Sequence, residues 1–82
     1  GKGNELYAKP LKKAKFLHGS SFGDAWRHFP RATPLGVLLH ESGKEPELHL
    51  SPDDSFKLTA DSSLVVLAGK DKDAEPERYY ML

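Results

Sequence analysis

The longest apolar run in the chain is Leu64–Ala68, which lies between Ser63 and Gly69 and contains no polar side chain. Successive side chains of a strand point to opposite faces, so a strand that is apolar at both parities needs cover on both faces. The run therefore predicts the central strand of a sheet, entered from a turn at residues 59–62 and left at Gly69.

Three further segments have the pattern of strands. Residues 5–9 alternate and are followed by Pro10, which indicates an edge strand or a bulge. Residues 34–41 and Glu47–Leu50 flank a turn at 42–44, and this spacing predicts an antiparallel hairpin. The clean alternation of the second of these strands indicates that one of its faces meets water.

One helix is predicted after the N-cap Ser21, with Asp24 close to the positive end of the helix. Its apolar residues recur at i, i+3, i+4 and i+7, and they are Phe22, Ala25, Trp26 and Phe29. Pro30 ends the helix because it disfavours the α conformation in the residue before it. We expect the aromatic stripe to be core rather than a ligand platform, with Arg27 and His28 facing outward.

The element order is strand, helix, strand, strand, strand, which predicts a single small α+β domain. We expect a mostly antiparallel sheet of about four strands with one main helix on one face. The predicted structural core consists of Phe22, Trp26, Phe29, Val37, Leu64 and Val66. The candidate covers of the second face are short: the segments 16–17 and 56–58 and the tail 79–82. Apolar surface that stays uncovered predicts isologous pairing with an identical lobe.

Composition narrows the class of protein. The chain has 82 residues, 38% apolar and 29% charged, within the range of folded single domains. Lysine plus arginine equals aspartate plus glutamate at 12 each, which argues against a nucleic-acid binder. The absence of cysteine excludes disulfides and cysteine-based zinc sites. No apolar run approaches the ~18–20 residues that span a bilayer, and no secretory signal is visible.

No group of residues forms a recognisable catalytic or metal-binding motif, so we predict no enzyme, no metal and no cofactor. Of the four histidines, only His40 and His49 are expected to approach each other, across the hairpin, and zinc needs three or four ligands. Turn chemistry explains Asp53 and Asp54 without calcium, because EF-hand spacing is absent. The basic run Lys12–Lys15 is either a patch for phosphate or an acidic partner, or a solvated edge that blocks strand pairing.

Five motifs in order carry a resemblance to a known family. They are Gly3–Tyr7, Phe22–Ala25, Phe29–Val37, Leu50–Asp54 and Asp61–Ala68. Together they resemble the C-terminal lobe of regulator-of-potassium-conductance domains, the TrkA-C-like domain, and are closest to the Castor/Pollux type of ion channel. The resemblance covers residues 3–73. It departs at Ala60, where such domains usually have glycine, so the turn here must avoid positive φ.

The resemblance implies a non-catalytic regulatory and oligomerisation module of a potassium or related cation channel or transporter. It implies a soluble lobe on the cytoplasmic side of a membrane, within a longer parent chain, that pairs with identical lobes and senses a small ligand. We expect residues 1–73 to form this lobe and residues 74–82 a charged tail or linker. The alternative is a stand-alone protein-interaction domain of the same fold without a transport partner.

Overall fold

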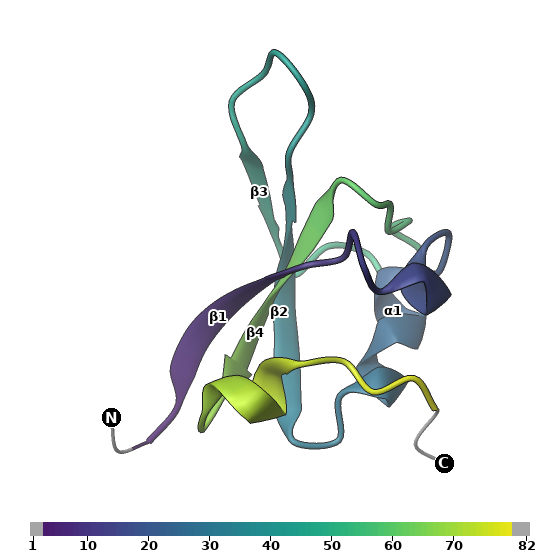
Figure 1. Cartoon of the computed structure of the whole chain (residues 1–82). Coiled ribbons are helices and arrows are strands. Elements are labelled where there is room, and N and C mark those ends of the chain that lie inside the picture. Colours follow the sequence, from purple (N-terminus) through teal and green to yellow (C-terminus); the bar gives the residue numbers. More distant parts are fainter. Residues whose placement is uncertain (1–2, 80–82) are drawn as a thin grey trace.

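The computed structural model describes residues 3–79 of the chain. Four strands form one antiparallel sheet: β1 (Glu5–Pro10), β2 (Ala32–Leu39), β3 (Glu47–Leu50) and β4 (Ser62–Ala68). Their order across the sheet is β1-β4-β2-β3, so the most apolar strand has a neighbour on both sides (Figure 1). The predicted α+β class, the central strand and the edge position of the strand that contains Pro10 are confirmed.

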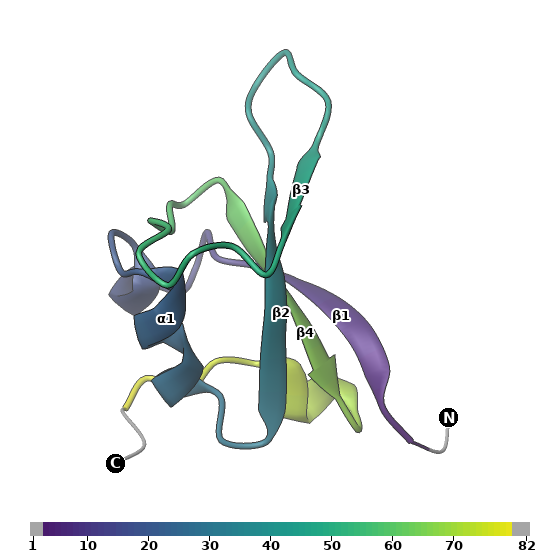
Figure 2. The ribbon, with the colours of Figure 1, turned by 180° about the vertical axis from the view of Figure 1, so that it is seen from behind.

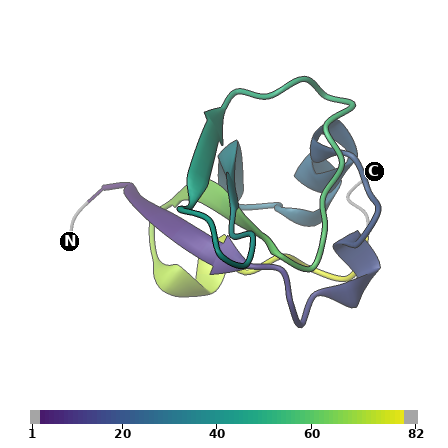
Figure 3. The same cartoon turned by 90° about the horizontal axis from the view of Figure 1, so that it is seen from above.

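The helical segments are short and lie beside one face of the sheet. They are η1 (Lys15–Leu17), α1 (Phe22–Ala25), η2 (Trp26–His28) and η3 (Asp71–Ala74). Segments η1 and α1 lie together beside the sheet in both views (Figures 1 and 2). The chain after β3 leaves the sheet edge, passes along the helical side and returns to β4 in the centre (Figure 3).

The return segment after β3 is tied to the helix by backbone hydrogen bonds. The amides of Phe22 and Gly23 donate to the carbonyls of Phe56 and Asp54, at 2.7 and 2.9 Å. A Cβ at Gly23 would come within 2.7 Å of the Asp54 Cβ, so this close approach requires glycine. Helix and loop therefore cover the sheet as one layer.

The helix begins as predicted and continues differently. The Ser21 hydroxyl accepts a hydrogen bond from the Asp24 amide at 3.1 Å, which confirms the N-cap. After one α turn the chain tightens into the 3₁₀ segment η2, in which residues three apart lie over one another. His28 therefore follows Ala25 into the core, and Trp26 turns outward.

Two expectations about this helix are consequently wrong. Trp26 was expected in the core, but 46% of its surface is exposed. His28 was expected to face outward, but it is buried and its Nδ1 lies 2.8 Å from the Glu77 carbonyl. The Glu77 amide in turn donates to the His28 carbonyl at 2.7 Å.

These contacts also fix the described part of the tail. Ala74 is fully buried, and the segment that follows is held by His28 through two hydrogen bonds. The expected boundary between residues 73 and 74 falls inside η3. Residues 74–77 therefore pack on the domain.

The core lies between the sheet and the helical layer. The predicted members Phe22, Phe29, Val37, Leu64 and Val66 are all buried. They are joined by further buried apolar side chains from the helical segments, the loops and the end of β4, namely Leu11, Leu17, Ala25, Leu58, Ala68 and Ala74. One face of the sheet is thus sealed by the helix and by the loops around it.

We predict that Trp26→Ala destabilises the domain far less than Phe29→Ala. Truncating a buried aromatic residue costs about 3–5 kcal/mol, and Phe29 is 4% exposed. Trp26 has already left half of its surface in water, so its removal forfeits much less burial. Urea unfolding of the two variants measures the difference. Equal losses would show that Trp26 anchors the helix after all.

Candidate functional site: an open apolar sheet face

The second face of the sheet carries three cross-strand rows of uncharged side chains. The register sets Leu6 beside Leu67 and Thr33 in one row. The middle row runs across all four strands and contains Ala8, Val65, Gly36 and Leu50. The third row contains Pro10, Ser63, Leu38 and Leu48. We call the apolar set Leu6, Ala8, Leu38, Leu48, Leu50, Val65 and Leu67 the open face.

The open face is exposed where the opposite face is sealed. Leu6, Leu48 and Leu50 keep 63%, 51% and 67% of their surface in water, while Leu64 and Val66 keep none. The segments around Phe16 and Phe56, considered as covers, pack with Leu17 and Leu58 on the helical side. Within residues 3–79 no segment of the chain covers this face. The remaining candidate, Tyr79–Leu82, lies outside the described residues except for Tyr79, which is 81% exposed.

Such a surface is a candidate contact site. Single exposed leucines are common, whereas apolar side chains on all four strands of one face form a contiguous patch of the kind that marks a contact. The three rows contain no charged residue, and at their margin the His40 Nε2 lies 3.3 Å from the Ser63 hydroxyl. An occupant of this face therefore needs an apolar, uncharged surface of its own.

Gly36 is the residue of the middle row that lacks a side chain, and the register of β2 against β4 shifts between Pro34 and Gly36. A Cβ at this position would lie 2.7 Å from the carbonyl oxygen of His49 in β3. The shift belongs to the pairing of β2 with β4, and the absence of a side chain lets β2 and β3 approach closely at this point. Gly36 itself is buried, and the Leu50 Cδ2 atom lies 3.4 Å from the position of that Cβ.

The edges of the sheet are less suited to binding than its face. Pro10 removes a backbone donor at the end of edge strand β1. Lys9 points to the helical side, where its Nζ pairs with Glu75 at 2.9 Å and with Asp71. The hydrogen bond to Asp71 raises the pKa of Lys9, so this amine stays charged. Strand addition at this edge is therefore disfavoured.

The histidines and aspartates that sequence reasoning considered do not converge. His40 and His49 lie on opposite faces, because His49 sits opposite Val37 while His40 contacts Ser63. The backbone carbonyls of Asp53 and Asp54 are occupied by the turn and the helix. In the part of the chain that the structure describes, no three histidine or acidic side chains form a group able to hold a metal ion.

Comparison with protein-family models, with curated proteins and with solved structures returned no match. The resemblance to the potassium-conductance regulatory lobe therefore stays a prediction. None of the helices between residues 3 and 79 is long and apolar enough to cross a membrane.

Proposed function

We propose that this domain is a non-catalytic pairing module that joins the open face of one copy to the same face of a second. The observation that carries the proposal is the exposed apolar face across four strands, opposite a sealed core. An isologous contact buries the same surface on both partners and satisfies both at once.

Charge supports a second copy as the partner. The chain has 12 basic and 12 acidic residues, so two copies carry no net charge and do not repel each other at long range. The face itself is uncharged, so stacking two of them desolvates no ion. A strongly charged partner would gain nothing from this surface.

The size of the face sets the expected strength. Four strands about 4.8 Å apart and roughly four residues long cover about 300 Å² in projection. A stable complex buries about 800 Å² on each partner. The isolated lobes should therefore pair weakly, and tethering in a longer parent chain would raise their effective concentration.

In keeping with the resemblance, the parent we propose is a potassium or related cation channel or transporter. The paired lobes would form part of a regulatory assembly on the cytoplasmic side of the membrane, and a small ligand would act on it. The sequence of the parent tests this part separately. Pore helices and a nucleotide-binding lobe upstream support it, and a parent without membrane-spanning segments contradicts it.

We predict that the domain associates in sedimentation equilibrium at ~0.5 mM, where even a Kd near 1 mM gives partial pairing. The double variant Leu48→Lys/Leu50→Lys should be monomeric at the same concentration, because it places two charges in the contact. Both leucines are more than half exposed, so the fold should survive.

The matched control for this experiment adds two lysines elsewhere. Ser42→Lys/Ser55→Lys makes the same change in net charge at exposed positions outside the open face. This control variant should associate as the unsubstituted domain does. A strictly monomeric unsubstituted domain, or equal association of the two double variants, would refute pairing through this face.

A further inference from the structure

A basic hollow lies between the segment that follows β1 and the described tail. Its largest part, about 520 Å³, is lined by Lys13, Lys15, Phe16 and Arg78. Two smaller parts share Lys13 with it and extend along Pro10 to Glu75. A space of this size is within the range of small-molecule sites. The hollow shares no residue with the open face.

The charged side chains that line the hollow are mostly basic, although the chain as a whole has no net charge. Four basic side chains at its rim make no hydrogen bond or ion pair with any residue between 3 and 79: Lys12, Lys13, Lys15 and Arg78. The only acidic residue among the lining residues is Glu75, whose carboxylate pairs with Lys9 at 2.9 Å, an amine that it shares with Asp71. An excess of unpaired cations is left facing one concavity.

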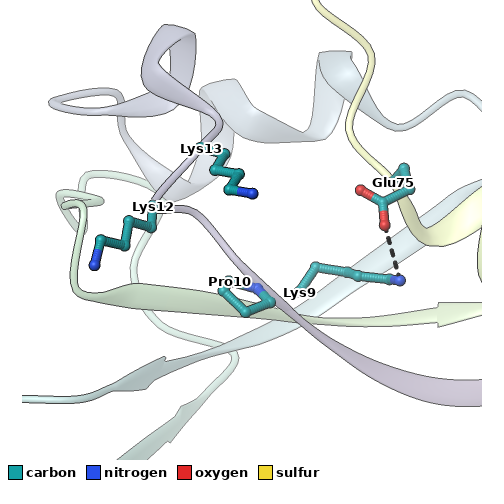
Figure 4. A pocket seen from close by; sticks show the side chains of 5 residues that line it. All are labelled: Lys9, Pro10, Lys12, Lys13 and Glu75. Atoms are coloured by element: carbon teal, nitrogen blue, oxygen red, sulfur yellow. Dashed lines mark hydrogen bonds and ion pairs between the residues drawn. The ribbon is translucent and has the colours of Figure 1, made fainter.

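The close view shows how these side chains are arranged (Figure 4). Lys13 reaches over Pro10 toward the side of Glu75, while Lys9 lies below and bonds to Glu75. Lys12 extends away from Glu75. Lys13 is thus the cation common to all parts of the hollow, with Lys15 and Arg78 in its largest part.

Both walls are held in place by the core. The first wall is anchored by Leu11, which is fully buried and whose amide donates a hydrogen bond to the Ser62 carbonyl at 2.9 Å. The second wall is held by the two hydrogen bonds between His28 and Glu77. A ligand would meet a preformed site and would order only the lysine and arginine side chains.

An aromatic ring forms part of the floor. Phe16 is 36% exposed, and its centroid lies 5.2 Å from that of the buried His28. The ring therefore contacts the core through His28 while it lines the hollow, where it can contact an apolar or aromatic group of a ligand.

We propose that this hollow binds a small molecule that carries a chain of two or three phosphate groups. Lysine and arginine are the side chains that recognise phosphate, and charge-assisted hydrogen bonds to them are among the strongest. Lys13, Lys15 and Arg78 surround one space, which favours several linked anionic groups over a single one. A nucleotide and an inorganic polyphosphate share this chemistry, and Phe16 distinguishes them.

Calorimetric titration of the domain with ATP and with inorganic tripolyphosphate, in about 50 mM salt, tests the proposal. We expect saturable one-to-one binding with a Kd below about 1 mM for at least one of them. Tighter binding of ATP, lost in Phe16→Leu, identifies a nucleotide as the ligand. Equal affinities, unchanged in Phe16→Leu, identify the phosphate chain alone. Either result supports the proposal.

Two double variants of equal charge decide whether the binding is local. Lys13→Gln/Lys15→Gln should weaken binding by about tenfold or more, because it removes two of the three phosphate contacts. Lys44→Gln/Lys70→Gln removes two lysines that do not line the hollow and should bind as the parent does. Absence of saturable binding to both probes, or equal weakening in the two variants, would overturn the proposal. None of these variants changes a residue of the open face. The result of the sedimentation experiment on pairing is therefore independent of the result for phosphate binding.

Discussion

Leu64→Ala is expected to lower the free energy of unfolding by about 2–5 kcal/mol, the range for leucine truncation in a close-packed core. Leu64 is fully buried in the central strand, opposite Val37 on one side and Lys9 on the other. The lost side chain would leave a cavity between the sheet and the helical layer. Small domains have a total stability of about 5–15 kcal/mol, so this loss is a large fraction of the total.

The same substitution at Leu6 provides the control. Leu6 lies in the neighbouring strand, on the open face, with 63% of its surface exposed. Leu6→Ala should cost less than about 1 kcal/mol at dilute, monomeric concentration, because little surface is returned to water. Urea unfolding at micromolar concentration measures both variants. Equal losses would mean that the open face is covered in solution.

The contrast between these two leucines shows how far the sequence determines this fold. The run Leu64–Ala68 is apolar at both parities, which was enough to predict a central strand. Pro10 predicted the edge, and the segment Glu47–Leu50 was predicted with its observed bounds. Each of these predictions rests on the residue pattern within a single strand.

Which face of the sheet is sealed is not a local property. It depends on the path of the segments before α1 and after β3, which both run on the helical side and bury Leu17 and Leu58 there. Alternation within a strand does not reveal that path. The sequence therefore predicted that some apolar sheet surface would stay uncovered. The register of the four strands shows which residues form that face.

The helix shows a second limit, which concerns its pitch. The spacing of Phe22 and Trp26 fits an α-helix, and the switch to 3₁₀ geometry after Ala25 moves the tryptophan out and His28 in. The reason to bury His28 is its bond to Glu77, 49 residues later. No pattern within the helix contains that information.

The turn before β4 followed the expectation drawn from the resemblance. Ala60 stands where glycine was expected, and a turn without positive φ was required. Ser51 is the one non-glycine residue with positive φ in the described chain, so Ala60 adopts an ordinary conformation.

Gly36→Ala is expected to destabilise the domain by about 1–3 kcal/mol, the usual cost of overpacking. The new Cβ would meet the carbonyl oxygen of His49 at 2.7 Å and the Leu50 Cα at 3.4 Å. The first obstacle is backbone, so no side-chain rotation relieves it. Strand β3 must move away from β2, which weakens the hairpin. The need for glycine here is spatial, because Gly36 is not among the residues with positive φ.

Gly69→Ala is the matched control for that substitution, at the end of the neighbouring strand. The nearest atom to a Cβ there is the Asn4 Oδ1 at 3.8 Å, and Gly69 has no positive φ either. The added methyl should be neutral or stabilise by about 0.4–1 kcal/mol, because it restricts the unfolded chain. Urea unfolding should therefore show a loss of stability for Gly36→Ala and no loss for Gly69→Ala. If Gly36→Ala also stabilises, β2 and β3 are farther apart in solution than their register requires.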